Sequence, residues 1–345
     1  TGNVGVTKQI GTIDVDKSVT FVGILDAAAV DVAAGATITI DDDFTGAVTT
    51  LTTTAILDFQ VDAGGAQVTT VTGTIDGLAV EGGDIKADNS GGVVFTGKVG
   101  SIKSIGDVNI DELTTFNESL SGETMNVAAS KVLNIKNGLT ITDDSEILGK
   151  VDFGGATAYD VSAFLQDGGA AGNIAVTNTS ANGVTFAKKI GFNDGGTADA
   201  LDKFVIAVSG TRVVLQEAGN EIDEVDFEDG AILELDRTIG SGDVVFSNAT
   251  DTLAADLDDG MKIFLPSNLK SGESLFLLSD VTTTTTMAAN LNKALQDNAL
   301  FDYTAAAVDN AVGDNVGGDD DIQVTATARS GAAIGAQIGS DTNTA

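Results

Sequence analysis

The side chains of this sequence that could do chemistry are mainly carboxylates, and they gather in short acidic runs. Calcium is bound in proteins by about six to eight oxygen atoms from carboxylates and carbonyls, so closely spaced aspartates are candidate ligands. The pairs Asp143–Asp144 and Asp258–Asp259 are two further acidic runs of this kind. The alternative is that all of these runs are solvated turns. The candidate calcium ligands are Asp41, Asp42, Asp43, Asp314, Asp319, Asp320 and Asp321.

Other catalytic groups are scarce. The chain contains no His and no Cys, which excludes the usual general base, zinc sites built on these residues and thiol catalysis. No GxSxG nucleophile motif is present. The arginines, Arg212, Arg237 and Arg329, lie far apart in the sequence. Acidic pairs are too numerous to single out the two carboxylates of a glycosidase, so we expect a protein that is not an enzyme.

Charge and composition restrict the partners and the core. The chain carries 51 acidic and 17 basic residues, a net charge of −34, which excludes nucleic acid because phosphate binding needs clustered Lys and Arg. No apolar run reaches the roughly 18 residues that a membrane-spanning helix needs. Aromatic residues are only 5% of the chain. The core is therefore expected to consist of Val, Ile, Leu, Ala and Thr, which suits thin, stacked sheets.

Short apolar alternations separated by turn residues run from about Gly5 to about Leu278. Examples are Val108–Ile110, Val184–Phe186 and Val213–Leu215, each with two large apolar residues one residue apart. Gly, Asn and Asp separate them at many places, and these residues tolerate left-handed backbone conformations. The pattern predicts a β-solenoid with coils of roughly 24 residues. A string of two or three Ig-like sandwiches is the alternative.

One strand–turn–strand phrase occurs three times. It reads VDVAAGATITI at Val30–Ile40, MNVAASKVLNI at Met125–Ile135 and VDFEDGAILEL at Val225–Leu235. The copies are 95 and 100 residues apart, which we interpret as about four coils and as a chain that stacks on itself. Five phenylalanines lie in strand patterns and are predicted to form internal stacks, with an exposed adhesive stripe as the alternative. They are Phe21, Phe116, Phe153, Phe186 and Phe246.

The pattern changes near the C-terminus, where a helix and a hairpin are expected to close the stack. Apolar residues at helical spacing predict the helix, and an acidic turn precedes the final alternating strand. A further helix is predicted in the middle of the chain. The predicted elements are strands at Leu275–Leu278, Leu300–Thr304 and Ile322–Thr327, and helices at Thr286–Leu300 and around Tyr159–Leu165.

Leu275–Ser330 resembles the end of the passenger domain in bacterial autotransporters, the type V secretion family. The segments that carry the resemblance are ALFDYT at Ala299–Thr304 and DIQVTATARS at Asp321–Ser330. Within that family, the segment is similar to rickettsial surface-layer outer membrane proteins. The resemblance implies an all-β fold, a right-handed parallel β-helix over residues 1–280 with a small α/β cap over 281–345. The outer-membrane barrel of that family does not follow in this sequence, so we expect it to have been cleaved off or dispensed with.

Three functions compete. The first is a structural subunit of a bacterial cell-surface layer or filament that binds copies of itself. The second is an adhesin that displays loops to a host receptor or glycan, with Ala170–Ala181 and Phe192–Leu201 as candidate loops. The third is a β-helix enzyme acting on polysaccharides. The cysteine-free, Thr- and Gly-rich composition and the start at Thr1 without a leader predict a processed protein, extracellular or on the surface of a Gram-negative bacterium.

Overall fold

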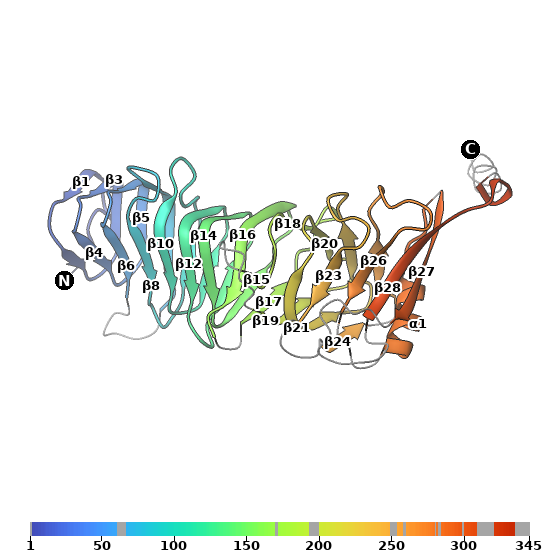
Figure 1. Ribbon diagram of the computed structural model, residues 1–345. Helices are drawn as coiled ribbons and strands as arrows, with labels where there is room; N and C mark the ends of the chain where they lie inside the picture. The colour runs from blue at the N-terminus through green and yellow to red at the C-terminus, as the bar shows by residue number, and fades with distance from the viewer. Residues whose placement is uncertain are drawn as a thin grey trace.

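Parallel strands stack along a single axis through most of the chain, as the computed structural model in Figure 1 shows. The chain is nearly all-β, with 54% strand and 4% helix, and its coils form a β-solenoid of about 10 turns. The predicted parallel β-helix with a small cap is confirmed, and the alternative of separate sandwiches is wrong. The structure describes residues 2–60, 67–169, 172–192, 200–248, 254–257, 260–279, 281, 284–298, 300–308 and 321–334.

The strands are short and begin within the first coil. Those of the first half are β1 Ile10–Val15, β2 Val19–Phe21, β3 Leu25–Val32, β4 Thr37–Ile40, β5 Phe44–Leu51, β6 Ile56–Phe59, β7 Thr69–Gly77, β8 Asp84–Ala87, β9 Val93–Phe95, β10 Ile105–Ile110, β11 Thr114–Phe116, β12 Leu120–Val127, β13 Val132–Ile135, β14 Leu139–Ile147 and β15 Lys150–Phe153. Those of the second half are β16 Tyr159–Asp167, β17 Asn173–Val176, β18 Val184–Phe186, β19 Leu201–Ile206, β20 Arg212–Leu215, β21 Asn220–Phe227, β22 Ile232–Leu235, β23 Val244–Ser247, β24 Ala254–Leu257, β25 Lys262–Phe264, β26 Ser274–Leu278, β27 Phe301–Val308 and β28 Asp321–Ala328.

Backbone pairing gives each coil three faces, which we name A, B and C in the order that the chain visits them. Face A includes β9, β11, β13, β15, β17 and β19. Face B includes β18, β20, β22 and β25, and face C includes β2, β4, β6, β8 and β10. Long strands such as β3, β12 and β14 bend around a corner and belong to two faces. The faces therefore merge into hydrogen-bonded sheets of 16 and 12 strands.

The recurring strand–turn–strand phrase is a corner of the solenoid. Val30–Ile40 crosses from face B to face C, Met125–Ile135 from C to A, and Val225–Leu235 from A to B. The three copies therefore occupy three different corners. The interpretation of their spacing as whole coils is wrong, because one local turn conformation serves these three different corners.

The sixth residue of each phrase makes the corner turn. Gly35, Ser130 and Gly230 have φ values of 72°, 63° and 76°, a left-handed conformation that favours glycine but that Ser130 also adopts. In each turn the amide of the next residue donates to the carbonyl three residues earlier, at 3.0, 3.0 and 2.9 Å. The turn is thus set by local hydrogen bonding, which explains why similar sequence segments recur without a fixed repeat length.

Other corners lie inside a strand and have no turn. In β14 the pairing register shifts, and the adjacent residues Asp143 and Asp144 are both partly exposed where the inward–outward alternation is interrupted. This acidic pair is therefore a strand corner and not a separate turn. The helix predicted around Tyr159–Leu165 is wrong, because this segment belongs to β16. Alternate residues are buried there, among them Tyr159 and Val161, which is the period of a strand.

The inward side chains line up in continuous columns, because the parallel strands of each face stay in register. Phe95 and Phe116 are direct neighbours on face A, with ring centroids 4.4 Å apart and planes within 2°. Phe204 contacts three more rings in the second half of the core. The column on face A consists of Phe44, Val71, Phe95, Phe116, Ile135, Phe153, Val176, Ile206, Phe227 and Leu257.

A helix and a hairpin close the C-terminal end of the stack. Parallel pairing ends at β26, on which β28 and then β27 add as antiparallel strands. The helix α1, Thr284–Ala294, lies beside β27 (Figure 1). It ends earlier than the predicted Thr286–Leu300, because Leu295 already pairs with Ile263 of the last coil. The strand predictions for this region are confirmed.

The free edge of β27 is occupied by side chains. Asn292 of α1 both donates to and accepts from the backbone of Ala305, at 2.8 and 2.7 Å. Asp297 accepts from the Tyr303 amide at 2.9 Å, and Asn298 accepts from the Phe301 amide at 2.8 Å. These groups use the backbone positions that another strand would need, so this end of the solenoid is closed.

Candidate functional site

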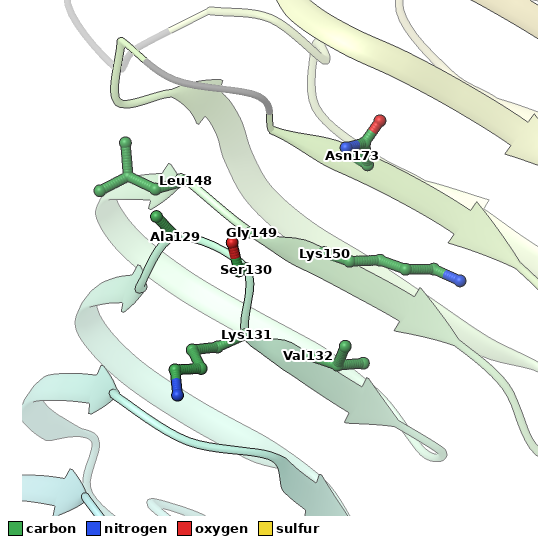
Figure 2. A pocket seen from close by; sticks show the side chains of 8 residues that line it. All are labelled: Ala129, Ser130, Lys131, Val132, Leu148, Gly149, Lys150 and Asn173. Atoms are coloured by element: carbon green, nitrogen blue, oxygen red, sulfur yellow. The ribbon is translucent and has the colours of Figure 1, made fainter.

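Three of the shallow hollows that the described residues form lie at corners of the solenoid. One of about 320 Å³ is formed by consecutive turns around Ser130 and Gly149. Figure 2 shows that its two lysines, Lys131 and Lys150, extend in different directions. Each lysine also faces an acid, Glu112 at 2.7 Å and Asp152 at 3.9 Å respectively. The hollow therefore lacks the converging polar groups that mark a ligand site.

A second hollow, also of about 320 Å³, brings together two of the three arginines. Arg212, Arg237 and Phe264 line it together with Glu234 and Asp236. Arg212 is ion-paired with Glu234 across neighbouring strands of face B, and Phe264 is partly exposed. The sequence did not predict that Arg212 and Arg237 line one hollow, because they are 25 residues apart and lie in successive coils. The third hollow, of about 270 Å³, is lined by Asp14, Asp16, Asp31, Val32, Ala33 and Thr52.

The predicted calcium ligands do not come together where the structure describes them. Asp42 accepts a hydrogen bond from the Asp43 amide at 2.8 Å, and Asp43 accepts one from the Thr70 amide at 2.7 Å. Asp321 lies buried at the other end of the molecule and accepts from the Ser279 hydroxyl at 2.6 Å. Within the described ranges, no three His, Cys, Asp or Glu residues are grouped to hold a metal. Asp314, Asp319 and Asp320 lie outside the described residues.

The predicted adhesive features have a mixed outcome. Phe116, Phe153, Phe186 and Phe246 are fully buried, so the prediction of internal stacks is confirmed for them. Phe21 is half-buried against the core. The loop expected at Ala170–Ala181 is wrong in part, because β17 forms inside it and continues face A. Most of Phe192–Leu201 lies outside the described residues.

An exposed apolar corner stands out on this acidic surface. Leu78, Val80 and Ile102 are 56%, 65% and 82% exposed, and they lie on two loops, 78–83 and 100–104, at the corner between faces B and C. We call these three residues the apolar corner. The two loops come from adjacent coils and are hydrogen-bonded to each other through Ser104 and Lys103.

Hydrogen bonds hold the loops of the apolar corner in place. The Asp76 carboxylate accepts from the Ile102 amide at 2.9 Å. Ser104 accepts from the Glu81 amide through its hydroxyl at 3.0 Å and from the Gly82 amide through its carbonyl at 3.2 Å. A side chain at Gly77 would collide with the carbonyls of these loops. The exposed apolar residues therefore stand on a fixed platform.

Carboxylates crowd the surface beside the apolar corner. Asp84 accepts a hydrogen bond from the Asp107 amide at 3.1 Å. Burial raises the pKa of Asp84, the hydrogen bond from the Asp107 amide opposes this shift, and repulsion from the Asp107 carboxylate adds to it. The pKa of Glu123 is also raised, by burial and then by Glu81, Asp107 and other nearby carboxylates. The sequence contains these residues in three separate segments, and only the stacking of coils places them together.

Carboxylates with raised pKa values make stability depend on pH. Burial raises the pKa of Asp58, as it does for Asp84 and Glu123. A carboxyl group with a raised pKa binds its proton more tightly in the folded chain, so stability falls as pH rises through the folded pKa and is recovered as pH falls toward the ordinary 3.8 or 4.5. We therefore expect a higher melting temperature near about pH 4.5 than near about pH 7.5, measured by circular dichroism.

Asp58→Asn tests this pH dependence at one residue. Asp58 is buried, and its Oδ1 has no hydrogen-bond partner within the described ranges, while Oδ2 accepts from Gln60 at 2.6 Å. The amide avoids burying a charge, so the variant is expected to melt higher than the wild type at neutral pH and to show a flatter pH profile. A wild-type melting temperature that stays constant or rises between the two pH values would contradict the prediction.

No helix among the described residues is both long and apolar enough to cross a bilayer. Comparison with known proteins adds no identification: no family model, no curated protein and no solved structure matches this chain. The fold and the geometry of the surface are thus the basis for any functional assignment.

Proposed function

We propose that this protein is a non-enzymatic structural subunit that binds copies of itself in a surface layer or filament of a bacterium, after export and processing. The observation that carries the proposal is the difference between the two ends of the solenoid. The C-terminal end is closed by the side chains on the edge of β27. At the other end, β1 and β2 each pair with a strand on one side only, within the part of the chain that the structure describes.

The edge formed by β1 and β2 has the properties of an interaction surface. Unpaired backbone groups on a strand edge can accept a strand of another chain. Val6, Ile10 and Val19 at this end are 51%, 37% and 37% exposed, so pairing would also bury apolar surface. The net charge of −34 opposes the approach of two copies, and salt or divalent cations are expected to screen this repulsion.

Light scattering on the purified chain tests the proposal. We expect self-association that increases with protein concentration and with added salt or calcium. The double variant Ile10→Lys/Val19→Lys places charges on the open edge and should stay monomeric. Val208→Lys is the matched control, because Val208 is 38% exposed but lies away from that end; it should assemble like the wild type.

A wild-type chain that remains monomeric at every concentration, with and without salt and calcium, would refute self-assembly. If the wild type assembles, negative-stain electron microscopy distinguishes a lattice from a filament. Equal assembly of the edge variant and the control would instead place the contact elsewhere on the molecule.

A second candidate function is adhesion to a host receptor or glycan. The hollow lined by Arg212, Arg237 and Phe264 favours it, because guanidinium groups and an exposed aromatic ring are typical of binding hot spots. A cell-binding assay with the isolated chain separates this function from self-assembly.

A further inference from the structure

We propose that the apolar corner is a docking site for a protein segment that carries apolar side chains flanked by Lys or Arg. Leu78, Val80 and Ile102 supply the apolar centre, with exposures of 56%, 65% and 82%. Isolated exposed apolar residues are common on protein surfaces, but three of them on two loops of adjacent coils that are hydrogen-bonded to each other indicate an interaction site. This site is separate from the solenoid end proposed for self-assembly.

Hydrogen bonds fix the two loops of the apolar corner in the absence of a partner. The Gly77 amide at the end of β7 donates to the Lys103 carbonyl at 3.2 Å, and the Gly82 amide of loop 78–83 donates to the Ser104 carbonyl of loop 100–104 at 3.2 Å. The Lys103 ammonium donates to the Leu78 carbonyl. Loops held in this way lose little conformational entropy when a partner binds, which favours affinity.

The negative charge around the apolar corner favours a basic partner. Glu81 lies on the same loop as Leu78 and Val80, and Asp84 and Asp107 follow the two loops in sequence and are hydrogen-bonded to each other. Lys103 is the basic residue of the two loops. A second copy would bring the same carboxylates and a net charge of −34, whereas a basic segment would pair with them. Charge complementarity therefore favours a basic partner over a second copy.

Fluorescence anisotropy with two synthetic peptides tests the docking site. The probe is an amphipathic peptide of Leu and Lys, and its control is a peptide of the same length with Glu in place of Lys. We expect the Leu/Lys peptide to bind the wild type and the Leu/Glu peptide not to bind. Leu78→Gln/Ile102→Gln is expected to weaken binding of the Leu/Lys peptide about tenfold, without altering the charge of the chain.

The matched control keeps non-specific attraction to an acidic protein separate from docking. Leu300 is 56% exposed, as Leu78 is, and lies in the C-terminal cap. Leu300→Gln should bind the Leu/Lys peptide like the wild type. Equal affinities of the two variants, or equal binding of both peptides, would overturn the proposal.

Two further readouts complete the test. Hydrogen exchange of the wild type should show slower exchange in loops 78–83 and 100–104 when the Leu/Lys peptide is added, and unchanged exchange there would overturn the proposal without relying on any variant. Light scattering gives the remaining outcome. A wild-type dimer that Leu78→Gln/Ile102→Gln converts to a monomer would make this surface an interface between copies and would overturn the assignment of a basic partner.

Discussion

Phe204→Ala is expected to cost about 3–5 kcal/mol of unfolding free energy, the largest effect of any single truncation that we predict. Phe204 is fully buried on face A. Its ring lies 5.8 Å from Phe186, 6.4 Å from Phe227 and 6.1 Å from Phe246, measured between ring centroids. Removing it leaves a cavity bordered by three rings that are fixed in neighbouring coils and cannot move in to fill it.

Denaturant unfolding followed by circular dichroism measures this loss. Phe264→Ala is the matched control, since it removes the same atoms from a ring that is 39% exposed on face B. The control should change stability by less than about 1 kcal/mol. Because each coil contacts mainly its neighbours, unfolding of the Phe204→Ala chain is expected to begin in the second half of the solenoid. Similar losses for both variants would contradict the proposed role of the aromatic stack.

Asn220→Leu is expected to destabilise the chain by roughly 3 kcal/mol or more, because each buried polar group that is left without a hydrogen-bond partner costs about 1–3 kcal/mol. Asn220 is fully buried. Its Oδ1 accepts from the Ile190 amide at 2.9 Å, and its Nδ2 donates to the carbonyls of Val245 at 2.9 Å and Glu217 at 3.1 Å. The side chain thus connects three successive levels of face C, where regular strand pairing is reduced to an isolated bridge at Ile190.

Two comparison variants make this prediction specific. Asn220→Asp keeps the acceptor for Ile190 but turns a carboxylate oxygen toward two carbonyls, so it should also destabilise the chain, and more at neutral than at acidic pH. Asn268→Leu is the control, because Asn268 donates to the Arg237 carbonyl at 2.8 Å from an exposed position. Thermal melts of the three variants provide the measurement. An Asn220→Leu variant with the melting temperature of the wild type would contradict the prediction and show that water replaces the amide.

Much of the fold was readable from local sequence. Alternation of the kind seen in Val108–Ile110 fixes a strand and its buried face. The strand–turn–strand phrase predicted strands on either side of a turn at each of its three positions, and the turn conformation at Gly35 and Ser130 is set within a few residues. The same reasoning was wrong at Tyr159–Leu165, where apolar residues four apart suited a helix but alternate burial in a sheet decided the outcome.

The repeat length could not be predicted from the sequence, because the coils differ in length. Val108 pairs with Met125, 17 residues later, whereas Ile174 pairs with Phe204, 30 residues later. Loops inserted at corners absorb the difference without disturbing the inward columns. A search for a constant period of roughly 24 residues therefore finds only corner turns that resemble one another.

The sequence by itself determined that this chain forms short strands, turns them at small or polar residues and carries a strongly acidic surface, since these properties depend on backbone preference, side-chain alternation and composition. Only the tertiary structure decided which distant segments became neighbours. Stacking joined the loops of Leu78 and Ile102, brought Arg212 and Arg237 to the lining of one hollow and kept Asp43 far from Asp321. The physical reason is that lateral neighbours in a solenoid are set by hydrogen-bond register between coils, which depends on every preceding loop length.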